Sequence, residues 1–258
     1  MRGIAGKRVL VTAGGAGIGR TIAASFLSAG ARVWICDIDS EALAETRGAH
    51  PKLGASLTDV ADERAVDAMF EAVGQAFGGL DILANNAGTA GPTGPIESLD
   101  LGDWRRCVAV NLDGVFLCAR RAVPLLKAAG GGAIINLSST AGLMGYPLRT
   151  PYASAKWAVI GLTRSLAIEL GPHGIRVNAI CPGSVEGARM ARAIRAEAAV
   201  RGVSEEEVRQ TYIRTTSLRC FVAPDDVAAM TLFLCSDLGA SISGQAIAVD
   251  GNTETLSG

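Results

Sequence analysis

Tyr152 and Lys156 stand four residues apart in a stretch of helical composition, so their side chains rise from one face of the predicted helix. A phenol with the ordinary pKa of about 10 is a poor proton donor or acceptor at neutral pH. A neighbouring ammonium favours the phenolate, so this pair is suited to exchanging a proton with a substrate. The same spacing also occurs by chance, with the tyrosine half in the core and the lysine in water.

Ser139 adds a hydroxyl group to this pair. Residues 133–137 form an apolar run after the triple glycine at 130–132, which is typical of a buried parallel strand. Ser139 therefore lies just beyond a predicted strand end, and the helix with Tyr152 follows it. A hydroxyl donor at this place favours the chemical interpretation of the Tyr152 and Lys156 pair.

Residues 12–19 form a glycine-rich turn between a predicted strand at 8–12 and a predicted helix at 20–29. Glycines let the backbone approach a ligand, and the first amides of the helix point toward a phosphate. The spacing is G-x-x-x-G-x-G with Ala13 in the first position, so the turn requires a negative φ at Ala13. An ordinary tight turn is the alternative interpretation.

Asp37 ends the second predicted strand, where a carboxylate can accept hydrogen bonds from an adenosine ribose and repel a 2′-phosphate. Ile38 is not basic, and Ala16 occupies the place in the turn where a phosphate-reading cation would stand. These residues favour NAD over NADP. Alternatively, Asp37 or Asp39 caps the helix that begins near Ser40.

Strands alternate with helices along the whole chain, which is the pattern of a doubly wound parallel sheet. Asn111 is a poor residue for the middle of a helix unless its amide is used or the helix kinks there. That helix has apolar residues on several faces, which indicates that it is covered on two sides. Another subunit is one candidate for the second cover. The remaining predicted elements are strands at 31–36, 53–57, 80–84, 175–180 and 246–249, helices at 62–77, 103–129, 152–170 and 225–234, and one or two surface helices within 184–219.

The 258 residues, 49% of them apolar, are enough for one α/β domain with a full core over 1–258. A net charge of −1 with mixed signs gives no electrostatic case for nucleic acid or an anionic membrane. Apolar windows fall short of the ~20 residues of a membrane span, and no signal-peptide layout is seen, so we expect a cytoplasmic protein. Six scattered cysteines and two histidines predict buried free thiols and no metal site.

Together these motifs resemble the classical short-chain dehydrogenases/reductases over essentially the full length of the chain. Each motif is weak alone, but their combination is highly specific. The resemblance implies a Rossmann-like sheet of about seven strands with helices on both faces, a homotetramer, and hydride transfer between nicotinamide and an alcohol or ketone. The motifs are the turn at 12–19, Asp59-Val60, Asn85-Asn86-Ala87-Gly88, Asn111, Ser139, Tyr152-x-x-x-Lys156, Pro182-Gly183 and Val249-Asp250-Gly251.

The resemblance also implies a role for each catalytic residue. Tyr152 would be the general base in oxidation and the general acid in reduction, and Ser139 would hydrogen-bond the substrate oxygen. Lys156 would bind the nicotinamide ribose and lower the pKa of Tyr152, and Asn111 would hold a water that relays the proton.

Cofactor contacts are implied along the carboxyl edge of the sheet. The threonine that the family carries after Pro-Gly is absent, because Ser184-Val-Glu-Gly187 follows instead, and the backbone of Val185 is the remaining candidate to hold the carboxamide. The implied cofactor residues are Gly14, Gly15, Gly17, Ile18, Gly19, Asp37, Ile38, Asp59, Val60, Asn86, Ala87, Gly88, Tyr152, Lys156, Pro182, Gly183 and Val185.

The segment 184–219 and the loop before Tyr152 are expected to cover the substrate. Arg149, three residues before Tyr152, is near enough to contact a carboxylate, phosphate or sulfonate on the substrate, or else caps a loop or faces water. The arginines at 189, 192 and 195 recur at helical spacing beside Glu197, which indicates a solvated, salt-bridged face.

Three functions remain open. The first is an NAD-dependent dehydrogenase or reductase of a small secondary alcohol, polyol or hydroxy acid. The second is an NADPH-dependent reductase of carrier- or CoA-bound 3-oxoacyl groups, against which Asp37 argues. The third is a dinucleotide-binding protein without catalysis, against which the intact set of Ser139, Tyr152, Lys156 and Asn111 argues.

Overall fold

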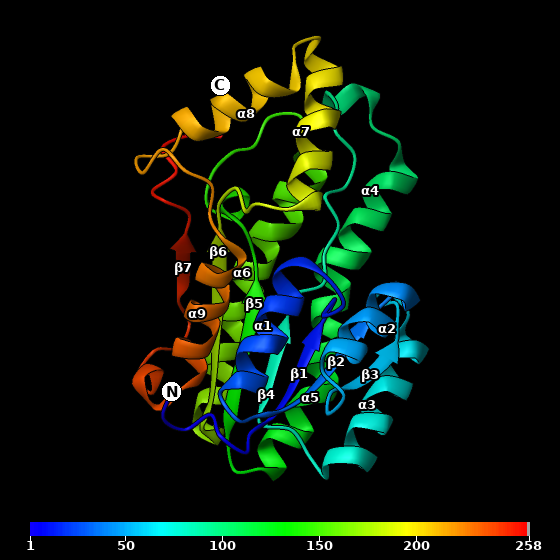
Figure 1. Ribbon diagram of the computed structural model, residues 1–258, viewed down its shortest axis with the longest axis vertical. Coiled ribbons are helices and arrows are strands. Elements are labelled where there is room, and N and C mark those ends of the chain that lie inside the picture. Colours follow the sequence, from blue (N-terminus) through cyan, green and yellow to red (C-terminus); the bar gives the residue numbers. More distant parts are fainter. Residues whose placement is uncertain (257–258) are drawn as a thin grey trace.

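The computed structural model describes residues 1–256 and contains a seven-stranded sheet in the order β3-β2-β1-β4-β5-β6-β7 (Figure 1). Each strand runs parallel to its neighbours. The order reverses direction between β1 and β4, which is where such sheets bind ligands. The strands are β1 (Arg8–Thr12), β2 (Arg32–Asp37), β3 (Gly54–Leu57), β4 (Ile82–Asn85), β5 (Gly132–Leu137), β6 (Ile175–Pro182) and β7 (Ala246–Val249).

Helices cover both faces of the sheet, as predicted for a doubly wound fold. Val9 and Val11 of β1 pack with one helix layer and Leu10 packs with the other, and all three are fully buried. Strands covered on both faces form continuous apolar runs, which is why the sequence shows them so clearly. One layer holds α1 (Gly17–Ser28), α2 (Ser40–Ala49) and α9 (Pro224–Cys235), and the other holds α3 (Glu63–Phe77), α5 (Gly114–Ala128) and α6 (Thr150–Leu170).

The helical stretch predicted over 103–129 is helical in the structure, but a π-helical turn interrupts its regular α-helix. The structure has α4 (Leu101–Val108), a π-helical turn at Ala109–Asp113, and then α5. Asn111 lies in that turn, and its side-chain amide donates to the carbonyl groups of Cys107 at 2.9 Å and Thr89 at 3.0 Å. An amide that bonds to backbone carbonyls competes with the regular helix, so the turn widens around this residue.

Two further helices, α7 (Ala188–Arg201) and α8 (Glu205–Arg214), lie beyond the carboxyl ends of the strands (Figure 1). They pack on each other through a small apolar cluster of Ile194, Ala198, Val208 and Tyr212. We call residues 184–219 the lid. It carries two helices, within the one or two that the sequence predicted.

Five of the six cysteines are buried free thiols, but Cys220 is exposed, so the prediction of burial is wrong for that residue. Cys220 lies in the polar connection after α8, where no apolar layer covers it. Within residues 1–256, no helix combines the length and the apolar character that crossing a membrane requires.

Candidate active site

Ser139 and Tyr152 meet at the carboxyl edge of the sheet. Ser139 follows β5 and caps a short 3-10 turn, where its hydroxyl accepts a hydrogen bond from the amide of Ala141 at 3.2 Å. Pro151 occupies the first turn of α6, a position where proline favours helix initiation, and Tyr152 follows it. The hydroxyl of Ser139 lies near enough to that of Tyr152 to lower the pKa of the phenol.

Lys156 is 2% exposed and lies one turn after Tyr152 on α6. Its Nζ donates to the carbonyl of Leu137 at 2.8 Å and lies 5.7 Å from the centre of the Tyr152 ring. Burial lowers the pKa of the Lys156 amine, and the neighbouring Tyr152 partly opposes that change. The carbonyl at the end of β5 therefore fixes the amine beside the phenol.

The net effect of the site on Tyr152 is to lower the pKa of its phenol below the ordinary value. Burial acts in the opposite direction and is the largest single influence. The positive charges of Arg189 and Lys156, the hydrogen bond with Ser139 and the charge of Arg149 together outweigh burial. The tyrosine is therefore prepared for proton exchange by its surroundings.

Asn111 brings an unpaired acceptor to the same place. Its Oδ1 is buried with no hydrogen-bond partner, because its amide nitrogen is the atom that bonds to Thr89 and Cys107. A Cβ atom added to Gly88 would lie 2.8 Å from this oxygen and 3.4 Å from Lys156 Nζ. A buried acceptor without a donor is costly, so the site is suited to a hydrogen-bonding group that joins Asn111 and Lys156.

The glycine turn leaves the start of α1 open to an anion. Ala16 is the N-cap residue and provides no side-chain cap, and the first turn carries no acidic residue, so the terminal amides keep their donors. Gly19 must be glycine, because a Cβ atom there would lie 2.1 Å from the carbonyl oxygen of Ala13. These features fit the diphosphate of a dinucleotide.

The expectation of a negative φ at Ala13 is wrong, because φ is 50° there. Hydrogen bonds hold the strained residue in place. The side-chain amide of Asn86 donates to the carbonyls of Thr12 and Ala13 at 3.0 and 3.1 Å. Asn86 therefore braces the turn with its side chain.

Asp37 and Asp39 make different contacts in the structure, and only Asp39 caps the helix. Asp39 caps α2 by accepting from the amides of Glu41 and Ala42. Asp37 instead lies beside the turn and accepts from the amide of Gly15 at 3.0 Å. Its carboxylate is thus placed at the end of β2, where an adenosine ribose would bind.

The other predicted cofactor residues follow strand ends or lie near the turn, and their side chains differ in exposure. Ile38 is 69% exposed, whereas Val60 is 5% exposed and belongs to the core. Asp59 accepts from the amide of Ala61 at 2.9 Å within the loop between β3 and α3. The remaining predicted cofactor residues lie at three places along the carboxyl edge. These are Gly14, Gly17 and Ile18 at the glycine turn, Ala87 and Gly88 after β4, and Pro182 and Gly183 at the end of β6.

Val185 lies in an isolated parallel bridge with Val222. The bridge uses the carbonyl of Ser184 and the amide of Glu186. In a parallel bridge of this kind, the amide and carbonyl of the central residue point to the other side. The backbone groups of Val185 therefore face away from Val222 and are available to a ligand.

The structure corrects the interpretation of two arginines. For Arg149 the alternative of facing water is wrong, because it is 4% exposed, and it caps a loop instead, since its Nη2 donates to the carbonyl of Ala90 at 2.7 Å. Arg189 is exposed but is not a merely solvated residue, because its Cζ lies 5.9 Å from the centre of the Tyr152 ring. The helical spacing of 189, 192 and 195 gave no sign of this, since it depends on how the lid folds over the sheet.

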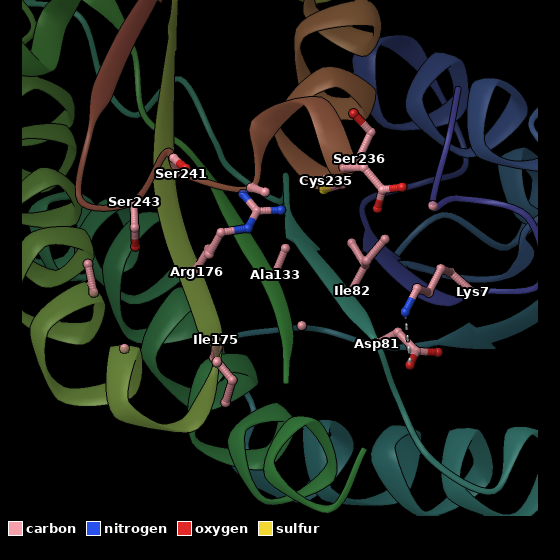
Figure 2. Close-up of a pocket in the computed structure, with 17 residues that line it drawn as sticks. Lys7, Asp81, Ile82, Ala133, Ile175, Arg176, Cys235, Ser236, Ser241 and Ser243 are labelled. Atoms are coloured by element: carbon pink, nitrogen blue, oxygen red, sulfur yellow. Dashed lines mark ion pairs between the residues drawn. The ribbon is translucent and has the colours of Figure 1, made fainter. Parts of the chain in front are cut away.

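A cavity of about 530 Å³ lies at the opposite edge of the sheet, away from these groups (Figure 2). Its lining residues include Lys7, Asp81 and Arg176, which lie at or just before the starts of strands. Arg176 donates to the carbonyls of Leu234 and Ile242 and so closes the carboxyl end of α9. Ligands of doubly wound sheets bind at the carboxyl ends of the strands, so this cavity is not the candidate site.

Comparison with known proteins gives matches over nearly the whole chain. A protein-family model described as "Enoyl-(Acyl carrier protein) reductase" matches residues 12–252. The chain is 37% identical to 2-(S)-hydroxypropyl-CoM dehydrogenase 3 of Xanthobacter autotrophicus over 255 residues, which cover 96% of each chain. It is also 37% identical to cis-4-hydroxycyclohexanecarboxylate dehydrogenase of Sinomonas cyclohexanicum over 250 residues, which cover 95% of this chain and 96% of that one.

Among solved structures, NAD⁺-bound xylitol dehydrogenase superposes with a TM-score of 0.94 and is 28% identical. The match covers 97% of this chain and 100% of the xylitol dehydrogenase chain. The two proteins therefore share their fold along nearly the whole chain.

Proposed function

The chain belongs to the classical short-chain dehydrogenase/reductase family, and on that basis we propose that it is an NAD-dependent oxidoreductase of a secondary alcohol or its ketone. As a member of the family it is an oxidoreductase acting on CH–OH groups with a nicotinamide dinucleotide. The observation that carries the finer proposal is the placement of Tyr152 beside the hydroxyl of Ser139 and a fixed ammonium.

The proposed substrate is a small alcohol, polyol or hydroxy acid. Two of the similar proteins support this range by name, one as a dehydrogenase of xylitol and the other as a dehydrogenase of a hydroxycyclohexanecarboxylate.

We propose NAD rather than NADP because of Asp37. Its carboxylate would accept hydrogen bonds from the ribose hydroxyls and repel a 2′-phosphate. The amides at the start of α1 would hold the diphosphate, and the backbone of Val185 would hold the carboxamide. When bound, the nicotinamide ring supplies or accepts the hydride.

In oxidation, the phenolate of Tyr152 takes the proton of the substrate hydroxyl, and in reduction the phenol returns it. Ser139 holds the substrate oxygen through its hydroxyl. Lys156 stabilises the phenolate, since its amine is fixed 5.7 Å from the ring centre by the carbonyl of Leu137. The free Oδ1 of Asn111 accepts from a water that carries the proton away from Lys156.

Tyr152→Phe tests this mechanism. The variant keeps the ring and loses the exchangeable proton, so we expect kcat for a turned-over secondary alcohol to fall about 10³-fold, within the range for a general base. Binding of NAD, measured by calorimetry, should stay close to that of the wild type. Retention of most of the activity would contradict the mechanism.

A panel of alcohols and ketones with NAD and NADP, followed by the absorbance of the reduced nicotinamide, tests cofactor and substrate class together. The description of the matching family model names an acyl carrier protein, which is the carrier that one rival would use, an NADPH-dependent reductase of carrier- or CoA-bound 3-oxoacyl groups. Preference for NADPH with a 3-oxoacyl thioester would select the rival. The absence of turnover in every combination would leave a dinucleotide-binding protein without catalysis.

We also propose that the enzyme assembles as a homotetramer. Large apolar side chains are exposed on helices that leave a flank of the molecule uncovered, with Leu101 on α4, Phe116 on α5, and Trp157 and Ile168 on α6. Burial of such residues against other subunits is the ordinary way to remove them from water. Light scattering should give a mass of about four times 26.4 kDa, and a mass of 26.4 kDa would contradict the assembly.

A further inference from the structure

Arg149 is a buried cation without an acidic partner. Its side chain is 4% exposed, its Nη2 donates to the carbonyl of Ala90, and its Nε is buried with no hydrogen-bond partner. Within residues 1–256, no carboxylate lies at ion-pair distance from it. Buried charges in proteins are normally paired, because an uncompensated one is costly. The rings of Tyr146 and Tyr152 lie 5.4 and 5.5 Å from its Cζ and stabilise the cation in part, but they leave it free to pair with an anion from elsewhere.

Arg189 approaches the same place from the lid. The Cζ atoms of Arg149 and Arg189 lie 5.5 and 5.9 Å from the centre of the Tyr152 ring. Arg189 also has no ion-pair partner in the described part of the chain. By contrast, Arg195 and Arg201 on the same helix are paired with Glu205 and Glu197.

The reaction itself accounts for one cation near the phenol, which is Lys156. Arg149 and Arg189 add two more within 6 Å of the same ring. A guanidinium presents its donors as a planar fork that fits the oxygens of a carboxylate, sulfonate or phosphate. Two such forks beside the group that exchanges the proton are suited to a substrate that brings its own negative charge.

We propose that Arg149 and Arg189 form an anion subsite beside Tyr152, and that the natural substrate is a secondary alcohol or ketone with an oxyanion group a few bonds from the reacting carbon. The inference rests on the proposed function, because Tyr152 marks the position of that carbon. Arg149 would hold the anion from the start of α6, and Arg189 would close over it when the lid is docked.

The test compares alcohols that differ in charge but not in shape. The probes are 3-hydroxybutanoate, 4-hydroxycyclohexanecarboxylate and 2-hydroxypropanesulfonate, each against its own amide. In the wild type, kcat/KM for an accepted anion should exceed that for its amide by about 10- to 100-fold, as charge-assisted hydrogen bonds provide. In Arg149→Met and in Arg189→Met, this ratio should fall toward one. Arg149→Lys keeps the charge but loses the planar fork of donors, so its ratio should lie between that of the wild type and that of Arg149→Met.

The ratio separates recognition from proton transfer. Loss of either arginine also changes the pKa of Tyr152, but that change affects an anion and its amide equally. Arg192→Met is the matched control, since Arg192 is exposed on α7, and its ratio should equal that of the wild type. Because Arg189 is exposed, Arg189→Met remains a valid test even where the loss of the buried Arg149 disturbs folding.

The diphosphate of the cofactor is the other source of an oxyanion near Arg189, whose Nη1 lies 3.8 Å from the place of a Cβ atom on Gly88. An unchanged ratio with a raised Kd for NAD in Arg189→Met would overturn its assignment to the substrate. Amides turned over as well as their anions by the wild type would overturn the whole subsite and leave the proposed function intact.

A measurement without turnover completes the test. Without cofactor, 3-hydroxybutanoate should raise the Tm of the full-length wild type more than its amide does. The double variant Arg149→Met, Arg189→Met should lose that difference. If no alcohol or ketone is turned over with NAD or NADP, the proposed function fails, and this difference alone then supports or overturns the subsite.

Discussion

Ala13 has a left-handed backbone in the turn that faces the cofactor. Its φ of 50° is a conformation that residues with a Cβ atom rarely adopt, and it costs roughly 1–2 kcal/mol. The structure tolerates this because the side chain of Asn86 ties the carbonyl groups of Thr12 and Ala13. A strained residue at the phosphate-binding turn lowers the stability of the free enzyme.

Ala13→Gly should therefore raise the free energy of unfolding by roughly 0.5–1 kcal/mol, the strain relieved less the extra entropy of an unfolded glycine. Urea unfolding measures the change. Ala44→Gly is the control of opposite sign, because Ala44 is exposed inside α2, where glycine costs about 1 kcal/mol. Destabilisation by both substitutions would contradict the explanation.

Arg189 sets the ionisation of Tyr152 from outside the predicted catalytic group. After burial, which acts in the opposite direction, its charge is the largest influence on the pKa of Tyr152, and it lowers that pKa. Arg189→Met should therefore raise the pKa of Tyr152. Since oxidation needs the phenolate, the rise of kcat/KM with pH should move to higher pH.

The measurement uses a neutral secondary alcohol, so that recognition of an anion plays no part. Arg192→Met should keep the profile of the wild type. An identical profile in Arg189→Met would show that its charge does not reach the phenol in solution.

Much of the site could be predicted because local order places it. Ser139 follows a strand end and Tyr152 and Lys156 share a helix face, so short stretches of sequence determine their meeting. Arg189 depends instead on how the lid packs over the sheet, a contact between distant segments. The left-handed Ala13 could not be predicted either, because Asn86, far along the chain, holds it.

Among the elements, the lid and the loop before α6 are joined by a chain of two tyrosines. The hydroxyls of Tyr146 and Tyr212 are 2.5 Å apart, and that of Tyr212 donates to Glu197 at 2.6 Å. Burial, together with Tyr146 and Glu197, raises the pKa of Tyr212, so it stays protonated. Because the hydroxyl of Tyr212 donates its proton to Glu197, it accepts a hydrogen bond from the hydroxyl of Tyr146. These two hydrogen bonds connect α7 and α8 to the loop before α6.

Tyr212→Phe removes both hydrogen bonds and keeps the ring in the apolar cluster of the lid. We expect KM for the alcohol to rise about tenfold, as the loss of buried hydrogen bonds warrants, because the lid spends less time closed. Amide exchange of residues 188–214 should become faster.

Tyr146→Phe removes one of the two bonds and should give a smaller rise in KM. Unchanged KM and unchanged exchange in Tyr212→Phe would show that the apolar cluster alone holds the lid.

Alternation of strands and helices was predictable because the central strands are buried on two faces and most helices on one. The break in the helix around Asn111 was foreseen as one of two possibilities, but its form depends on the carbonyl of Thr89 from another segment. The hydrophobic periodicity of the sequence does not indicate such a contact between distant segments.

At the scale of the molecule, the amino edge of the sheet is held by charge. Asp81, just before β4, accepts from Nε and Nη2 of Arg8 at 2.7 and 3.0 Å and from the amide of Arg8 at 2.8 Å. Lys7 lies 4.0 Å from the same carboxylate (Figure 2). This ion pair joins β1 to β4, the two neighbouring strands at which the order of the strands in the sheet reverses.

Asp81→Asn should lower the free energy of unfolding at pH 7 by about 2 kcal/mol, as for a hydrogen bond to a charged group. Burial opposes ionisation of Asp81, but the bonds and charges of Arg8 and Lys7 outweigh it and hold the pKa below its usual value. A carboxyl with a depressed pKa stabilises the fold above its unfolded pKa, and this contribution disappears as pH falls through the folded pKa. The difference from the wild type should therefore shrink at pH 3.

Urea unfolding at the two pH values, at one protein concentration, measures the effect. Asp67→Asn is the comparison, because Asp67 pairs with Arg121 on the surface, where ion pairs contribute little. An equal loss of unfolding free energy in both variants would mean that Asp81 stabilises the fold no more than an ordinary surface carboxylate does.

The small apolar cluster inside the lid means that this segment satisfies much of its own packing. Selection on residues 184–219 can then alter which molecules are accepted without rebuilding the sheet below, as long as the charge at Arg189 that lowers the pKa of Tyr152 is kept. Grafting the corresponding segment from a similar dehydrogenase onto this sheet would thus transfer a substrate preference, and a graft that retains an arginine at position 189 would also preserve the proton-exchanging phenol.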